Sequence, residues 1–302
     1  GVVQVQGTIN GYGERCGNAN LCSVIPTLKL KLGIDCIGEQ RLKKLADVAR
    51  YVSEFANLPP DPHLPYVGSS AFGHKAGLHI SGMINRAPCY QHIDPGLVGN
   101  RGRVLISELS GISAVVYKAK ERGLDLQSEQ ARRVLERVKE LGGQGFQYSD
   151  ADASFELLSR RAQPQYQPPF ELVDFMVVEE RRRRPPALGG EMLSEAMVKV
   201  SVAGEVIHTA AEGNGPVNAL DSALRKALVQ FYPELATIKL IDYKVRILDE
   251  GAGTSSRVRV LIESSDGEHE WRTVGSSTNI IEASWLALAD SLEYWLLRRS
   301  SP

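Results

Sequence analysis

Apolar residues recur along the chain with spacings that predict alternating strands and helices. Residues 2–9 (VVQVQGTI) form a strand-like run, and after Asn18 the apolar positions follow a helical spacing as far as Leu28. Residues 41–58 predict one amphipathic helix with a single apolar stripe. That stripe consists of Leu42, Leu45, Val48, Val52 and Phe55. The prolines of residues 59–70 exclude a helix there, because proline removes a donor and biases its predecessor to extended backbone.

Two more helices are predicted at residues 128–141 and 151–161. We expect Ser128 to cap the first helix and Gly142-Gly143 to end it. The second is expected to begin after a cap at Ser149 or Asp150.

Beyond residue 169 the pattern changes to strands interspersed with two helices, and an internal repeat emerges. FELVDFMVV (170–178) is similar to IKLIDYKVRI (238–247), and residues 208–224 are similar to residues 272–288. Each half therefore predicts several strands followed by one helix. The buried face of the first of these helices is expected to contain Leu220, Ala223, Leu224, Ala227, Leu228 and Phe231. QPQYQPP (163–169) predicts a linker before this region.

Composition narrows the class of protein. The chain has 302 residues, 43% of them hydrophobic, and a formal charge of −1. That length supports two or three compact units, and the charge gives no case for binding nucleic acid or an anionic membrane. No apolar run approaches the roughly 20 residues that span a bilayer. The four cysteines have no CxxC spacing and suit reduced thiols. We expect a soluble, cytoplasmic protein.

The first residue is Gly rather than Met, and a strand-like run follows at once. We expect the sequence to begin in the middle of a larger domain.

The stretch GTINGYGERCGNANL (7–21) is the first candidate for chemistry. Its glycines suggest a dinucleotide loop, but the spacing is not GxGxxG, and Glu14 would face a pyrophosphate. A plain turn is a second interpretation. The third is a site at the carboxyl end of a strand, where α/β barrels place their chemistry. There Asn18 would offer a hard oxygen ligand for Mg²⁺ or Mn²⁺.

The second candidate is SSAFGHKAGLHISG (69–82). His74 and His79 are five residues apart, which is a poor spacing for a helical zinc pair. An imidazole that titrates near neutrality suits proton transfer better. Tyr90 follows His79 by eleven residues and is a candidate for the same pocket. Two structural loop histidines remain the competing interpretation.

The third candidate is EGNGPVNAL (212–220), which lies at a predicted strand-to-helix junction. Backbone N–H groups at such a helix start bind anions, and the carboxylate of a free amino acid would fit. An ordinary helix start with Pro216 in its first position explains the same residues. Both interpretations stay open.

Four segments in this order, GTINGYGERCGNANL, AFGHKAGLHISG, YQHIDPGLVGNRGRVLISELSG and EGNGPVNALDSALRKAL, resemble the isopropylmalate/citramalate/homocitrate synthase family. The resemblance covers nearly the whole chain and is nearest to the longer, citramalate-forming members. It implies a metal-dependent Claisen condensation on a (β/α)₈ barrel, in which acetyl-CoA is the co-substrate and a 2-oxo acid the acceptor. It also implies a homodimer in which each active site is shared between subunits.

The resemblance assigns roles residue by residue. Asn18 is the candidate metal ligand, with Glu14 beside it as a loop-ordering and candidate catalytic residue. His79 and Tyr90 are the candidate catalytic pair that enters the partner's barrel, and His74 is a further candidate. The candidate residues for binding an amino-acid effector are Gly213, Gly215, Val217, Asn218, Asp242 and Tyr243.

The resemblance also predicts what the chain lacks. The family's main ligands for a divalent metal (Mg, Mn or Zn) come from an Arg-Asp/Glu element and an HxH pair, and neither occurs in these 302 residues. We therefore expect three regions. Residues 1–35 would be the last strand and helix of the barrel, 36–165 mostly helical linker subdomains, and 168–300 a regulatory domain of two βββα units. Such a chain would be inactive alone.

Three functions follow as expectations. The first is the C-terminal part of a synthase that condenses acetyl-CoA with pyruvate and is inhibited by isoleucine. The second is the corresponding part of a synthase that uses 2-oxoisovalerate and senses leucine. The third is an amino-acid-binding dimerisation module without catalysis.

Overall fold

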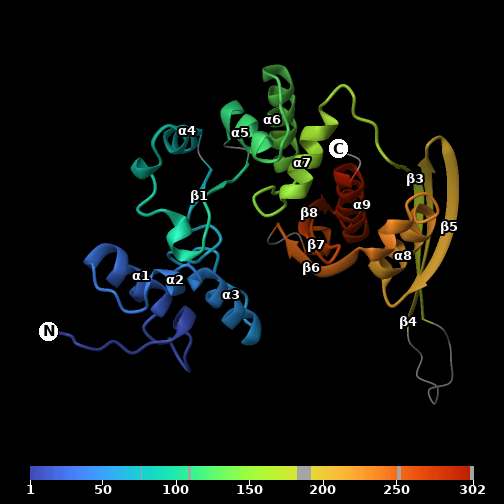
Figure 1. Ribbon diagram of the computed structural model, residues 1–302. Coiled ribbons are helices and arrows are strands. Elements are labelled where there is room, and N and C mark those ends of the chain that lie inside the picture. The colour runs from blue at the N-terminus through green and yellow to red at the C-terminus, as the bar shows by residue number, and fades with distance from the viewer. Residues whose placement is uncertain (76, 108–109, 182–191, 250–252, 300–302) are drawn as a thin grey trace, which may run out of the picture. The chain divides into compact units, whose positions relative to one another are not determined.

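The computed structural model describes residues 1–75, 77–107, 110–181, 192–249 and 253–299 (Figure 1). The chain has a mixed α/β architecture and divides into two compact units. Unit 1 contains residues 1–105 and 109–114, and unit 2 contains residues 106–108 and 115–302.

Unit 1 is mostly helical, with one parallel pair of two-residue strands. Its main elements are α1 (Leu21–Leu32), α2 (Glu39–Leu42), α3 (Leu45–Phe55), β1 (Gly73–His74), α4 (Gly77–Arg86) and β2 (Arg103–Val104). α1 begins where the Asn20 side chain accepts a hydrogen bond from the Cys22 amide at 2.9 Å. Its core joins α1, α2, α3 and the following loops around Cys22, Leu42, Leu45 and Val98.

The strand predicted at residues 2–9 does not form. Residues 1–7 have no regular structure, and Thr8 makes only a single bridge, to Asn20. Val2 and Val3 are 84% and 100% exposed. A strand is stable only beside a partner, and the described residues pair with none of residues 2–7. The prediction was therefore wrong for this chain.

The prediction of a single helix at 41–58 is also wrong in two respects. It is broken at Lys43–Lys44 into α2 and α3, and Val48 and Phe55 are 40% and 84% exposed. The buried face of α3 instead carries the small residues Ala46, Ala49 and Ser53. Small side chains are needed there because the opening loop packs directly against the helix backbone.

The described residues of unit 2 form two three-stranded antiparallel sheets and five α-helices, the first of which begins in unit 1. The helices are α5 (Ile112–Glu121), α6 (Ser128–Gly143), α7 (Asp152–Arg161), α8 (Pro216–Leu228) and α9 (Ile280–Arg299). The strands are β3 (Glu171–Arg181), β4 (Met192–Val202), β5 (Glu205–Gly213), β6 (Lys239–Ile247), β7 (Val258–Ser265) and β8 (Glu270–Ser277). The sheet orders are β3-β4-β5 and β6-β7-β8.

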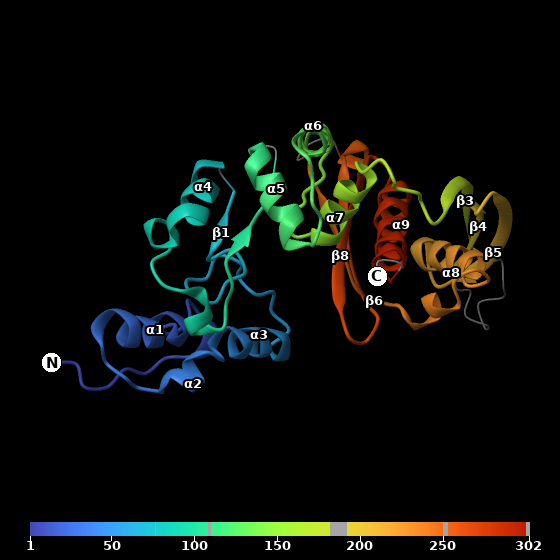
Figure 2. The same cartoon turned by 45° about the horizontal axis from the view of Figure 1, so that its top comes forward.

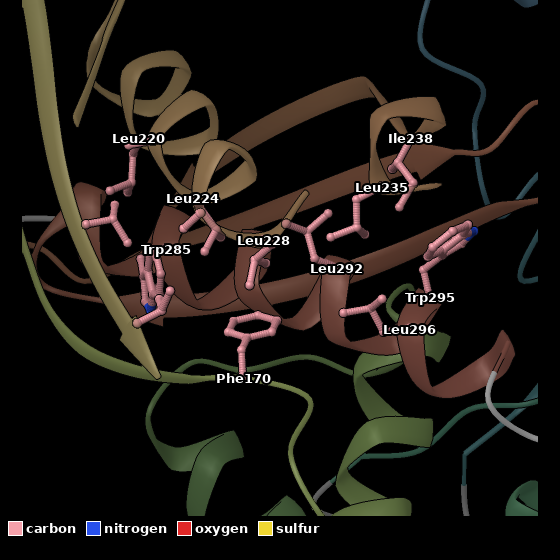
Figure 3. Close-up of a cluster of buried hydrophobic side chains, with 14 of the residues drawn as sticks. Phe170, Leu220, Leu224, Leu228, Leu235, Ile238, Trp285, Leu292, Trp295 and Leu296 are labelled. Atoms are coloured by element: carbon pink, nitrogen blue, oxygen red, sulfur yellow. The ribbon is translucent and has the colours of Figure 1, made fainter. Parts of the chain in front are cut away.

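The first sheet buries one face against α8. In β4 the inward positions alternate strictly, at Ala196, Val198, Val200 and Val202, as the period of a strand requires. On α8 the predicted buried face is confirmed, with Phe231 partly buried just beyond the helix. Figure 3 shows leucines of this face meeting Trp285 and Leu292 of α9.

The second sheet is covered by α9, whose buried residues lie on nearly every side of the helix. A helix that is apolar all round must be enclosed, and β7, β8, α8 and α7 all contact it. Its few polar groups have partners, since the Trp271 indole N–H donates to Ser291 and the Trp295 indole N–H donates to Asp266.

α7 closes the exposed edge of β8, as Figure 2 shows. Ser154 of α7 accepts a hydrogen bond from the backbone N–H of Val274 at 3.0 Å and donates to Asp290 of α9 at 2.8 Å. Burial raises the pKa of the Asp290 carboxyl, and the charge of Arg161 opposes that shift. One serine thus joins a sheet edge to the central helix.

The remaining helix boundaries differ slightly from those predicted. α6 is capped by Gln127 in a reciprocal capping box with Gln130, not by Ser128, and it ends after Gly143. α7 follows Ala151, and neither Ser149 nor Asp150 caps it. A glutamine can replace serine as a cap when its side chain reaches the N3 amide.

Residues 163–169 form neither helix nor strand, as predicted, but they are anchored. Tyr166 donates its hydroxyl hydrogen bond to Glu293 at 2.7 Å, and Tyr232 donates to the Pro169 carbonyl at 3.0 Å. Burial and Glu293 raise the pKa of Tyr166 to about 12.

None of the described helices has the length and apolar character needed to cross a bilayer.

Ser154→Ala should lower the free energy of unfolding by about 2–3 kcal/mol, because it leaves the Val274 amide without its partner and removes a donor from Asp290. Urea unfolding followed by circular dichroism measures the change.

Ser159→Ala is the matched control in the same helix. Ser159 is also fully buried, but its hydroxyl donates only to the Phe155 carbonyl one turn earlier. That local bond adds little to a helix, so a loss below about 1 kcal/mol is expected. Equal losses for the two variants would contradict the bridging role of Ser154.

Candidate functional site

The short parallel pair β1–β2 positions the first candidate histidine. Gly73 pairs with Arg103 and His74 with Val104, and the Leu105 amide donates to the His74 carbonyl at 2.9 Å. A Cβ at Gly73 would lie 2.9 Å from Cδ1 of Leu105, so a larger residue here would require that side chain to move. β1 therefore holds His74 at the start of the segment that carries His79.

His74, His79 and Tyr90 lie together in unit 1. The ring centroids of His79 and Tyr90 are 4.9 Å apart, and the His74 ring stands 6.4 Å from each of them, nearly perpendicular to both. α4 carries His79, and Tyr90 follows a short 3₁₀ helix (Ala87–Cys89) that turns the chain back. The sequence-predicted trio is thus one side-chain cluster.

Gly82 of α4 makes room for Tyr90. A Cβ at this position would lie 2.1 Å from Cε2 of the tyrosine ring. The ring therefore lies directly on the helix backbone, one turn beyond His79. The sequence analysis predicted no helix here and did not single out Gly82, although a glycine inside a helical pattern often has a packing role.

The three rings differ in exposure. His79 is exposed and Tyr90 is 39% exposed, whereas His74 is only 9% exposed. Burial, together with the nearby His79, lowers the pKa of the His74 imidazole, so that ring is neutral near pH 7. The accessible His79 imidazole and Tyr90 phenol, beside the neutral and buried His74 imidazole, can exchange protons with a ligand. They can also hold its oxygen atoms by hydrogen bonds.

The opening loop is folded tightly on itself and on α3. Asn10 donates from Nδ2 to the Ala49 carbonyl at 2.8 Å and to Ser53 Oγ at 3.0 Å, and the Tyr12 hydroxyl lies 3.0 Å from the same serine. A Cβ at Gly17 would lie 2.3 Å from the Gly11 carbonyl oxygen. Much of the glycine content therefore serves close backbone packing.

Glu14 and Asn18 are exposed on this loop. The Asn18 side chain donates from Nδ2 to the Tyr12 carbonyl at 2.9 Å. Within the described ranges, no hydrogen bond or ion pair joins Glu14 or Asn18 to His74, His79 or Tyr90. Nor do those ranges contain a group of three His, Cys, Asp or Glu side chains placed to hold a metal. These residues alone do not fit a metal centre.

The candidate effector residues lie at the start of α8. Gly213 ends β5, and a Cβ there would lie 2.4 Å from the Ala219 amide nitrogen. Gly215 occupies the N-cap position without a side-chain cap, and the Asn214 amide donates to Asn218 Oδ1 at 3.1 Å. The helix start thus presents backbone N–H groups near a position that only glycine fits.

Val217 and Tyr243 belong to the same hydrophobic cluster, which α9 completes. The Tyr243 hydroxyl lies 2.8 Å from Ser284 Oγ of that helix. Asp242, in contrast, pairs on the surface with Lys244. The structure therefore brings Val217 and Tyr243 together and leaves Asp242 apart. Ser284 is a neighbour that the sequence analysis did not single out.

Comparison with known families identifies two domains. The family described as "Homocitrate synthase post-HMGL domain-like" matches residues 66–145, which include His74, His79 and Tyr90. The family described as "LeuA allosteric (dimerisation) domain" matches residues 150–296. The chain therefore contains the two kinds of domain, post-HMGL and allosteric, that occur in LeuA-type synthases.

Three curated relatives are similar over nearly the whole chain. The (R)-citramalate synthase of Geobacter sulfurreducens is 53% identical over 98% of this chain. Those of Synechocystis sp. and Streptomyces coelicolor are 51% and 50% identical over 98% and 99%. The chain spans 56%, 54% and 55% of these relatives' lengths, little more than half. It belongs to the isopropylmalate/citramalate/homocitrate synthase family.

Gly82→Ala should separate Tyr90 from His79 without unfolding the chain. The added methyl group would clash with the tyrosine ring, while alanine favours the helix by about 1 kcal/mol. We expect the nuclear Overhauser contacts between the two rings to disappear and the melting temperature to hold.

Gly143→Ala in α6 is the control, because nothing lies within 4 Å of its Cβ position. It should leave the contacts between His79 and Tyr90 intact. Retention of those contacts in Gly82→Ala would show that Gly82 does not determine the ring's place.

Proposed function

We propose that the protein carrying this chain is an (R)-citramalate synthase, an acyltransferase that condenses acetyl-CoA with pyruvate. The observation that carries the proposal is the identity of 50–53% over at least 98% of the chain to three enzymes with that name. The second support is the cluster of His74, His79 and Tyr90 inside the matched linker domain.

In this reaction a methyl proton leaves acetyl-CoA, the resulting carbon attacks the ketone of pyruvate, and water cleaves the thioester to release CoA. His79 is accessible and suits transfer of a proton to or from the reacting atoms. Tyr90 packs against it and presents a hydroxyl donor to a developing oxyanion. Because this chain alone does not fit a metal centre, the main ligands of the divalent metal would lie outside it, with Asn18 as its contribution.

The regions proposed from the sequence complete this assignment. Residues 1–35 would be the end of the barrel, 36–165 the linker subdomains and 168–300 the regulatory domain. We propose that the regulatory domain is a duplication, because the two halves share two features. β3 has a bulge between Leu172 and Asp174, and β6 has one between Leu240 and Asp242.

The second shared feature is a hydrogen bond between strand and helix. Thr209 donates to the Ala223 carbonyl and Thr273 to the Ala287 carbonyl, each at 2.7 Å and across 14 residues. Equivalent bonds at equivalent spacings favour a common origin for the two βββα units.

We further propose a homodimer, built on the outer faces of the two sheets, with active sites shared between subunits. Exposed apolar residues occur on β3 and β6, where a solvated sheet face would favour polar ones. They are Leu172, Val173, Met176, Val178, Ile241, Val245 and Ile247. The effector would be isoleucine, bound at residues 213–218 and Tyr243, in a cytoplasmic enzyme of isoleucine biosynthesis.

The full-length protein should turn over pyruvate with a kcat/KM roughly tenfold or more above that for 2-oxoisovalerate, because the branched acceptor carries two extra methyl groups. Release of CoA from acetyl-CoA measures the rate. A preference for 2-oxoisovalerate would assign the protein to 2-isopropylmalate synthesis instead. Turnover of neither acid would favour a binding module without catalysis.

Isoleucine should raise the melting temperature of the 302-residue chain more than leucine does, since a ligand that binds only the folded state stabilises it. Gly213→Ala should abolish the rise, because its Cβ would displace the amides of α8. Lysine serves as the control ligand. The absence of any shift with isoleucine would count against residues 213–218 as the effector site.

A further inference from the structure

His74 carries a buried nitrogen without a partner. Its Nε2 is enclosed from solvent and forms no hydrogen bond, and it is the one such side-chain atom in the described part of the chain. Leaving a buried polar group unpaired costs about 1–3 kcal/mol, so an orphaned nitrogen calls for an explanation.

The side chains around His74 indicate a role for its Nε2 in binding a ligand. The rings nearest to it are those of His79 and Tyr90, 6.4 Å away by centroid. Neither side chain makes a hydrogen bond in the described part of the molecule, and both reach solvent. Three polar side chains therefore converge with unused hydrogen-bonding capacity. Convergent polar groups without protein partners are typical of a ligand site.

Tyr90 is a partly exposed neighbour of His74, with its ring centroid 6.4 Å from that of the imidazole. The tyrosine ring lies against Gly82, which has no side chain. His74, in contrast, is fixed by the pairing of β1 with β2. A ligand that shifts the phenol ring would reach a nitrogen that is already in position.

We propose that His74 is a further ligand-binding residue of this site, and that its Nε2–H donates a hydrogen bond to the carbonyl oxygen of the bound substrate. The inference rests on the proposed function, which supplies two carbonyl compounds, an acyl thioester and a 2-oxo acid. A neutral imidazole is suited to this task because it donates a hydrogen bond without releasing its proton.

The electron balance of such a step is simple for the thioester. As a base removes the methyl proton, the electron pair of the C–H bond forms the carbon–carbon double bond of the enolate. The former carbonyl pair moves onto oxygen, and the Nε2–H of His74 stabilises that charge by a hydrogen bond while keeping its own proton.

Two variants separate binding from packing. His74→Phe keeps a flat ring in the buried slot and removes both nitrogens, while His74→Gln places an amide near the position of Nε2. His92→Phe is the control in the same unit, because His92 also packs against two aromatic rings, those of Tyr66 and Phe72.

The first measurement is thermal unfolding of the 302-residue chain, which needs no activity. Removal of an orphaned buried nitrogen should raise the melting temperature of His74→Phe by about 2–4 °C, whereas His92→Phe should show no such rise. A melting temperature of His74→Phe below that of the unsubstituted chain would overturn the inference.

The second measurement is steady-state turnover by the full-length protein. His74→Phe should lower kcat/KM by roughly tenfold to a hundredfold, and His74→Gln should recover part of the loss. A larger rise in KM for acetyl-CoA would assign the bond to the thioester, and a larger rise for pyruvate would assign it to the 2-oxo acid. Unchanged kinetics in both variants would overturn the inference. Absence of turnover by the unsubstituted protein would instead reject the proposed function, and the melting temperatures would then decide whether Nε2 is an orphan.

Discussion

Enclosure of α9 is the constraint on which unit 2 depends. This helix has apolar residues on nearly every side, so it is stable only when it is covered all round. The sheet β6-β7-β8 covers one side, α8 reaches it from the first βββα unit, and α7 packs along it. The two sheets and their helices therefore share one core rather than forming separate domains.

Two carboxylates on this enclosed helix are largely buried, and a small network of ion pairs and hydrogen bonds compensates for their loss of water. Asp290 and Glu293 lie on the buried helix, and Arg161 pairs with both at 2.7 and 2.5 Å. Ser154 and Tyr166 donate the remaining hydrogen bonds. Because these partners come from α7 and the segment after it, residues 152–166 are tied to the allosteric domain. The matched family accordingly begins at residue 150.

Unit 1 combines an apolar core with several close approaches to the backbone. Asn10 reaches the backbone of α3 because Ala49 and Ser53 are small, and Tyr90 lies on α4 because Gly82 has no side chain. Such contacts place His79 and Tyr90 beside each other from positions eleven residues apart. His74 lies beside this pair, buried and with an unpaired Nε2, and an unpaired buried polar atom calls for an explanation.

Several features could be predicted from the sequence because they depend on local periodicity. The buried face of α8 follows directly from the helical spacing of Leu220, Leu224 and Leu228. The similar segments at 170–178 and 238–247 indicated two related halves, and both contain a strand with the same bulge. His74, His79 and Tyr90 could be selected as a group because their motif resembles that of a known family.

Other features depend on partners distant in the chain, so the sequence alone could not decide them. The apolar residues 2–5 suggested a strand, but a strand requires a neighbour, and here they stay in water. Val48 and Phe55 had the right spacing for burial, yet the loop from residue 10 selected the smaller face of α3. The sequence by itself determined which residues carry apolar faces and which carry chemistry. The tertiary structure decided which of those faces are covered and which nitrogen is left unpaired, because burial depends on what packs against a residue.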